Sequence, residues 1–217
     1  MRKILILSSL APLLLLAIGF ALWRLWPSPP PAGKLTFDLA GHRLRFAPDY
    51  VRTADPPDPD RVDVVVLAPD FTPGAAHPRR LAAAGETDAN GRNQIFLTIE
   101  PAPKNDGRAA AASPAERYGP FLASEAQVTQ GGLLRRRFDD DSPFAGEDLY
   151  LAPPDGEEFF ARCDRAKIPS DGLPNVCTSE FRVENLSIGA RFDPAWLGDW
   201  RRLQANAVFL VRSAMGP

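Results

Sequence analysis

Apolar positions in the first 26 residues form one continuous run that no later part of the chain resembles. Residues 4–23 carry no charge and follow a basic start at Arg2 and Lys3. A helix of about 20 apolar residues is long enough to cross a ~30 Å hydrocarbon core. The pattern therefore predicts a transmembrane anchor over residues 1–26, in contact with the lipid bilayer through residues 4–23.

A cleavable signal peptide is the alternative interpretation of this segment. Signal peptides combine a basic start, an apolar core and small residues before the cut, and Gly19-Phe20-Ala21 is an acceptable cleavage site. In both interpretations the residues that follow are exported. Residues 27–33 contain four prolines, which favour an extended spacer, so they are predicted to be a linker before an exported domain over residues 34–217.

Within residues 34–217, short runs of alternating apolar and polar residues are typical of β-strands. The pattern predicts six to eight strands, among them 62–67, 94–100, 133–138 and 147–151. Three consecutive valines make residues 62–67 the strongest of these by composition, which indicates a central strand.

Two predicted hairpins set the direction of the sheet. In the first, Ala40-Gly41 turns the chain within residues 35–46. In the second, a two-residue turn at Glu184-Asn185 opposes Cys177 to Phe192 and places the apolar residues of both strands on one side. A longer loop is the alternative there, because Glu-Asn is not a favoured tight-turn pair.

Helix signals occur at two places. Ser113 begins a capping box with Glu116, and Pro120 limits that helix to a turn or two. The last helix starts at Asp193-Pro194, and its apolar positions recur at three- and four-residue intervals. Those positions are Trp196, Trp200, Leu203, Ala207 and Leu210. We interpret the two tryptophans as core residues, with ligand stacking as the alternative. The sum is an α+β fold: a mostly antiparallel sheet with a C-terminal amphipathic helix.

Charge and cysteine content narrow the setting. Residues 34–217 hold 22 basic and 27 acidic side chains, a net charge of −5, which argues against nucleic acid as a partner. Cys163 and Cys177 are the only cysteines, and an even count in an exported chain predicts a disulfide. Two buried thiols are the alternative if the domain faces the cytosol. The disulfide places the domain in the periplasm, with the anchor spanning the inner membrane once.

No catalytic or metal-binding motif is recognisable. The two histidines, His42 and His77, are interpreted as surface residues, and neither belongs to a zinc or triad pattern. The densest acidic run, residues 139–141, is interpreted as a solvated loop paired with the arginines at 135–137, with weak calcium binding as the alternative. We predict no cofactor.

The sequence therefore favours a binding protein over an enzyme. The leading interpretation is a membrane-anchored periplasmic accessory protein that contacts another envelope protein, for example as the immunity protein of a toxin. The alternatives are an envelope hydrolase that uses carboxylates and a structural assembly component. The loops over residues 53–61, 74–93 and 101–113 are the expected contact surface, because long loops in a compact domain are often functional.

Overall fold

The computed structural model describes residues 33–52, 58–74, 93–103, 113–129, 131–165 and 175–216. The predicted anchor, the linker up to residue 32, His77 and most of the three long loops lie outside these ranges. In the described ranges, no helix has both the length and the apolar character that a membrane span requires. Residues 33–217 form one compact unit.

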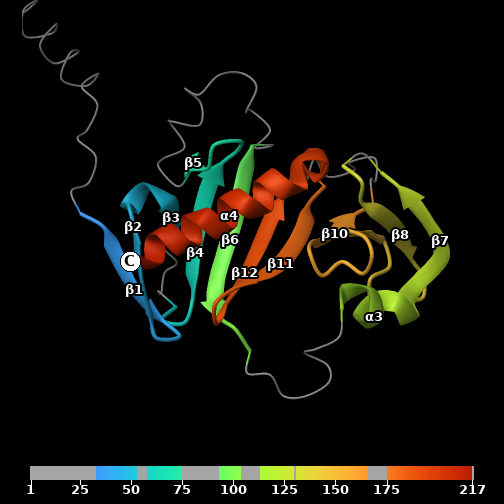
Figure 1. Ribbon diagram of the computed structural model, residues 1–217, viewed down its shortest axis with the longest axis horizontal. Coiled ribbons are helices and arrows are strands. Elements are labelled where there is room, and N and C mark those ends of the chain that lie inside the picture. Colours follow the sequence, from blue (N-terminus) through green and yellow to red (C-terminus); the bar gives the residue numbers. More distant parts are fainter. Residues whose placement is uncertain are drawn as a thin grey trace, which may run out of the picture. The chain divides into compact units, whose positions relative to one another are not determined.

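Two antiparallel sheets build this unit (Figure 1). The smaller is the hairpin of β1 (Leu35–Leu39) and β2 (His42–Phe46). The larger has the order β3-β4-β6-β12-β11-β10-β9-β8-β7, with β5 paired to β4. Its strands are β3 (Val51–Arg52), β4 (Val62–Leu67), β5 (Thr72–Pro73), β6 (Gln94–Pro101), β7 (Leu122–Val128), β8 (Leu134–Phe138), β9 (Glu147–Leu151), β10 (Phe160–Asp164), β11 (Cys177–Val183) and β12 (Leu186–Phe192).

Helical segments connect or cover the strands. They are the 3-10 turns η1 (Pro48–Tyr50), η4 (Gly119–Phe121) and η5 (Pro194–Asp199), and the helices α3 (Pro114–Tyr118) and α4 (Trp200–Met215). The antiparallel sheet and the C-terminal helix confirm this part of the predicted fold.

The β11–β12 hairpin has the register that the sequence predicts. Cys177 opposes Phe192 and Val183 opposes Leu186 across a two-residue turn. The other side of β12 pairs with β6, where Ile188 lies opposite Ile99. That second pairing joins segments far apart in the chain and was not predicted.

Three features of the sheet differ from the prediction. Strand β7 was missed, because its sequence LASEAQV is rich in residues that do not favour strands; its pairing with β8 makes it a strand. The described residues form twelve strands instead of six to eight, partly because β3 and β5 are too short to show a period. Strand β4 is not central, since only β3 and β5 lie beyond it.

The main core lies between the larger sheet and a layer formed by α4 and the β1–β2 hairpin. Helix α4 packs against β2 and β11 and crosses one face of the sheet (Figure 1). From the helix, Trp200, Leu203 and Ala207 are buried, as the helical pattern predicts, while Val211 is buried and Leu210 is only partly so. Each fully buried aliphatic side chain of this layer contributes roughly 1.5–3 kcal/mol.

A second core lies under α3 at the β7 end of the sheet. The predicted capping box is present: Ser113 accepts a hydrogen bond from the Glu116 backbone, and the Glu116 carboxylate accepts one from the Ser113 backbone. The short helix brings Tyr118 against Phe138 and Phe144, with ring centroids 5.7 and 5.3 Å apart. This cluster holds β7 to β10 together independently of α4.

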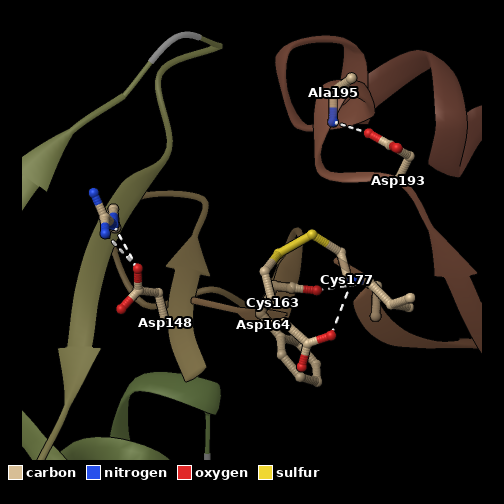
Figure 2. Close-up of a disulfide and its surroundings, with 10 residues drawn as sticks. Asp148, Cys163, Asp164, Cys177, Asp193 and Ala195 are labelled. Carbon is tan, nitrogen blue, oxygen red and sulfur yellow. Dashed lines mark hydrogen bonds and ion pairs between the residues drawn. A yellow bond between two sulfur atoms is a disulfide. The ribbon is translucent and has the colours of Figure 1, made fainter. Parts of the chain in front are cut away.

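The structure contains the predicted disulfide between Cys163 and Cys177 (Figure 2). The two residues lie directly opposite each other in β10 and β11, and both are buried. Beside the bridge, the Asp164 carboxylate accepts a hydrogen bond of 3.0 Å from the Val176 backbone. The bridge therefore ties the two halves of the larger sheet where β10 meets β11.

Candidate binding site on the C-terminal helix

The first residue of helix α4, Trp200, fixes the start of the helix against the rest of the domain. The indole Nε1 donates a hydrogen bond of 3.0 Å to the Gly131 carbonyl, and the ring stacks on Phe159 with centroids 4.9 Å apart. The preceding turn is capped by Asp193, whose carboxylate accepts a 2.8 Å hydrogen bond from the Ala195 backbone (Figure 2). Trp200 is only 1% exposed, so the structure confirms it as a core residue, whereas Trp196, in η5, packs against the core but is only partly buried.

A second ordered set of residues lies on α4 beside the core stripe, and one of them, Val208, still packs against the main core. Spacings of four, three, one and three place them along one stripe of the helix. They are Arg201, Ala205, Val208, Phe209 and Arg212. Phe209 is 73% exposed, which makes it a prominent apolar side chain on a face that an amphipathic helix normally leaves polar.

A groove of about 530 Å³ lies along this stripe. The stripe residues line it together with Glu158, Trp200 and Gln204, and we call it the α4 groove. Ala205, Val208 and Phe209 supply its apolar lining. Its two ends are marked by Arg201 and Arg212.

The charges of the α4 groove are mainly basic. Helix α4 contains no acidic residue. The Arg201 guanidinium lies 4.2 Å from the centroid of the Trp200 ring and 3.9 Å from the Glu158 carboxylate. For Arg212, none of the residues that the structure describes supplies an ion-pairing carboxylate. The net charge of the groove residues is therefore positive, whereas that of residues 34–217 as a whole is negative.

The opposite face of the sheet carries charges that compensate one another. Arg61 donates a 2.9 Å hydrogen bond to Asp63, and Thr98 donates a 3.0 Å bond to the same carboxylate. The contact with Asp63 raises the pKa of Arg61. At this point of the face, the charges of Arg61 and Asp63 neutralise each other.

The acidic run at residues 139–141 is also compensated. Asp140 accepts hydrogen bonds from Arg137 at 2.9 Å and from Arg165 at 3.3 Å, and these bonds hold the pKa of Asp140 below its usual value. The nearby Asp148, buried in β9, pairs with Arg165 and with Arg135 at 2.8 Å. Of the arginines at 135–137, Arg137 pairs with this loop as the sequence interpretation has it, whereas Arg135 pairs with Asp148 and Arg136 bonds the Ala123 carbonyl. No cluster of three or more metal-binding side chains occurs among the described residues.

The remaining candidate groups do not converge. The His42 imidazole bonds the Asn185 side chain, which links the β1–β2 turn to the β11–β12 turn. A carboxylate hydrolase would need two facing acids, one of them with a raised pKa. In the α4 groove the only carboxylate is Glu158, and the shifted acid among the described residues, Asp140, has its pKa lowered.

The exposure of Phe209 was not predicted from the sequence. The predicted core stripe agrees with the structure at Trp200, Leu203 and Ala207, and Phe209 lies outside it. The available signal was an aromatic residue nine positions after Trp200, outside the core stripe of the same helix. The expected contact surface, the long loops, lies largely outside the described residues.

Comparison with known proteins gives a likeness of fold. No family model and no curated protein matches the chain. The fold resembles that of Smlt3025, an immunity protein of the Stenotrophomonas maltophilia type IV secretion system, with a TM-score of 0.57 and 17% identity over 86% of this chain and 97% of that one. It also resembles the Neisseria meningitidis iron-regulated outer membrane lipoprotein FrpD, with a TM-score of 0.51 and 10% identity over 88% of this chain and 97% of that one. At these identities the likeness defines the fold alone.

Proposed function

We propose that the protein is a membrane-anchored periplasmic binding protein, which contacts another envelope protein and acts as an immunity protein. Residues 4–23 hold it in the inner membrane, and residues 34–217 form the exported binding domain. The observation that carries the proposal is the α4 groove, with the exposed Phe209 in its lining.

The composition of the groove supports a protein as the partner. Single exposed apolar residues are common on protein surfaces. Here the exposed aromatic lines an open groove together with further apolar side chains and two arginines. Aromatic and arginine side chains are the residues that most often dominate the energy of protein interfaces.

The disulfide supports the periplasmic location, because disulfides persist in oxidising compartments and are rare in the cytosol. The similar solved structures are described as an immunity protein and as an outer membrane lipoprotein, and both descriptions agree with a role at the envelope.

A reporter fusion tests the location. Alkaline phosphatase fused after Pro217 of the full chain is expected to be active, because that enzyme folds only where its disulfides form. The same fusion without residues 1–26 is the control and is expected to be inactive. An inactive full-length fusion that is nevertheless produced in normal amounts would contradict the periplasmic placement.

A competition assay tests the immunity role. Host cells that lack this protein are grown in contact with parental cells, and they are expected to lose viability relative to the same cells carrying the full chain. If the deficient cells survive contact as well as the complemented cells, the immunity role is wrong. The protein-binding role is then judged by crosslinking at the α4 groove.

A further inference from the structure

The geometry points to an amphipathic helix with acidic ends as the partner segment that occupies the α4 groove. This inference rests on the protein-binding role proposed above and specifies the chemistry of the partner. Three properties of the groove carry it: the spacing of its residues, the position of its charges and the unsuitability of other occupants.

The spacing favours a helix. The groove residues on α4 recur every three or four positions, which is the period of ridges that pack between two helices. Ala205 is small and lies one turn before Phe209, so a partner backbone can approach α4 there while its apolar side chains cover Phe209 and Val208. A β-strand repeats every two residues and would match fewer of these positions.

The charges favour acidic residues at both ends of that helix. Arg201 and Arg212 are separated by about three turns, or roughly 16 Å along the helix axis. A partner helix with carboxylates three turns apart can meet both guanidinium groups while its apolar residues cover the apolar lining. Arg212 is the stronger determinant, because Arg201 already lies 3.9 Å from Glu158.

A second copy of this chain does not satisfy the same groove. A parallel contact between two α4 helices would place each arginine beside its equivalent, and an antiparallel contact would place Arg212 of one copy where Glu158 is already shared with Arg201 of the other. The first arrangement opposes like charges and the second offers two guanidinium groups a single carboxylate, which weakens association. An anionic bilayer is also unfavourable, because the exported residues carry a net charge of −5 and Glu158 lies in the groove itself.

Site-specific photocrosslinking in the native membrane tests the inference. The full anchored chain carries p-benzoylphenylalanine at Phe209 or, separately, at Gln204, so that loss of the Phe209 side chain does not decide the result. The matched control position is Val128, which is 78% exposed on β7 and does not line the groove. The crosslinked partner peptide is identified by mass spectrometry.

Charge reversal supplies the second part of the experiment. In the chain that carries p-benzoylphenylalanine at position 204, Arg212→Glu is expected to lower the crosslink yield about tenfold, as loss of one interfacial charge pair predicts. Arg45→Glu makes the same charge change on the outer side of β2 and is expected to leave the yield within about twofold. Changing the mapped partner carboxylate to lysine should restore crosslinking to the Arg212→Glu chain.

The outcomes are distinct. Crosslinks at 204 and 209 to an acidic helical segment, lost with Arg212→Glu and restored by the partner change, support the inference. If a protein crosslinks only to position 128, the protein-binding role stands and the inference about the α4 groove is overturned. Adducts of lipid, of a second copy of this chain or of a non-helical segment at 209 also overturn it. No protein adduct from any of the three positions would overturn the inference together with the binding role.

Discussion

Loss of the disulfide should destabilise the exported domain by an amount that its loop length sets. Cys163 and Cys177 have a sequence separation of 14, so the bridge closes a loop of about 15 residues. In the chain-entropy model, a loop of this length lowers the entropy of the unfolded chain by roughly 10 cal/mol/K, or about 3 kcal/mol at 25 °C. Reduction should therefore lower the free energy of unfolding by about 3 kcal/mol.

The measurement is urea and thermal unfolding of the full chain in detergent, followed by far-ultraviolet circular dichroism with and without reductant. For a domain of 150–250 residues, 1 kcal/mol shifts Tm by about 2–4 °C, so reduction should lower Tm by roughly 6–12 °C. The double variant Cys163→Ala/Cys177→Ala should have a lower Tm that reductant does not change. This variant is the control for effects of the reductant on other parts of the chain.

The refuting result is an unchanged Tm in a sample whose thiols are shown to be reduced by alkylation and mass measurement. Because both cysteines are buried, alkylation is done after unfolding. An unchanged Tm would mean that residual pairing of β10 with β11 already restricts the unfolded chain, or that the bridge does not lower the entropy of the unfolded chain. Either outcome contradicts the entropic argument.

Three further predictions concern the structure around the site. Gly131→Ala and Gly132→Ala both force a residue with a side chain into positive φ, which costs about 1–2 kcal/mol. At Gly131 the added Cβ would also lie 2.9 Å from a backbone carbonyl oxygen of η5, so urea unfolding should show Gly131→Ala as the less stable variant by at least about 1 kcal/mol. Equal stabilities of the two variants would contradict the close approach. The pKa of Asp140 should lie below 3.8 in an NMR titration and rise in Arg137→Gln. Its folded pKa is depressed, so its ion pairs stabilise the fold above the unfolded pKa, and this contribution is lost as the pH falls through the folded pKa; a pKa that does not respond to the substitution would refute the assigned cause. The Asp148 carboxylate is 3% exposed and lies between two arginines. Asp148→Asn should therefore lower the free energy of unfolding by roughly 2–3 kcal/mol in the same urea assay. A change below about 0.5 kcal/mol would show that the ion pairs of Asp148 are not stabilising.

Several elements were predictable because their information is local. The alternation in residues 177–192 defines two strands and a turn, and only one register places both apolar sets on the same side. The capping box at Ser113 and the buried stripe of α4 are likewise set by residues three or four positions apart. The missed strand β7 shows the opposite case, because its residues have little strand preference and its pairing with β8 decides its conformation.

The candidate site was predictable only in part. The sequence places Arg201 and Gln204 outside the core stripe of the last helix, but it does not show whether another element covers that side. A groove exists there because, in the described structure, α4 uses one side to cover the sheet while Glu158, from the segment before β10, borders the other. No pattern within residues 200–215 predicts that neighbour.

The amino-acid sequence alone was sufficient for the antiparallel sheet with a C-terminal helix, the pairing of β11 with β12 and the cysteine pair, because each depends on neighbouring residues or on overall composition. The export segment at residues 1–26 stays a prediction. The order of strands in the larger sheet, the position of β12 between β6 and β11, and the exposure of Phe209 depended on tertiary packing. The physical reason is that propensity and periodicity act over a few residues. Whether a surface is covered depends on contacts between segments that lie far apart along the chain.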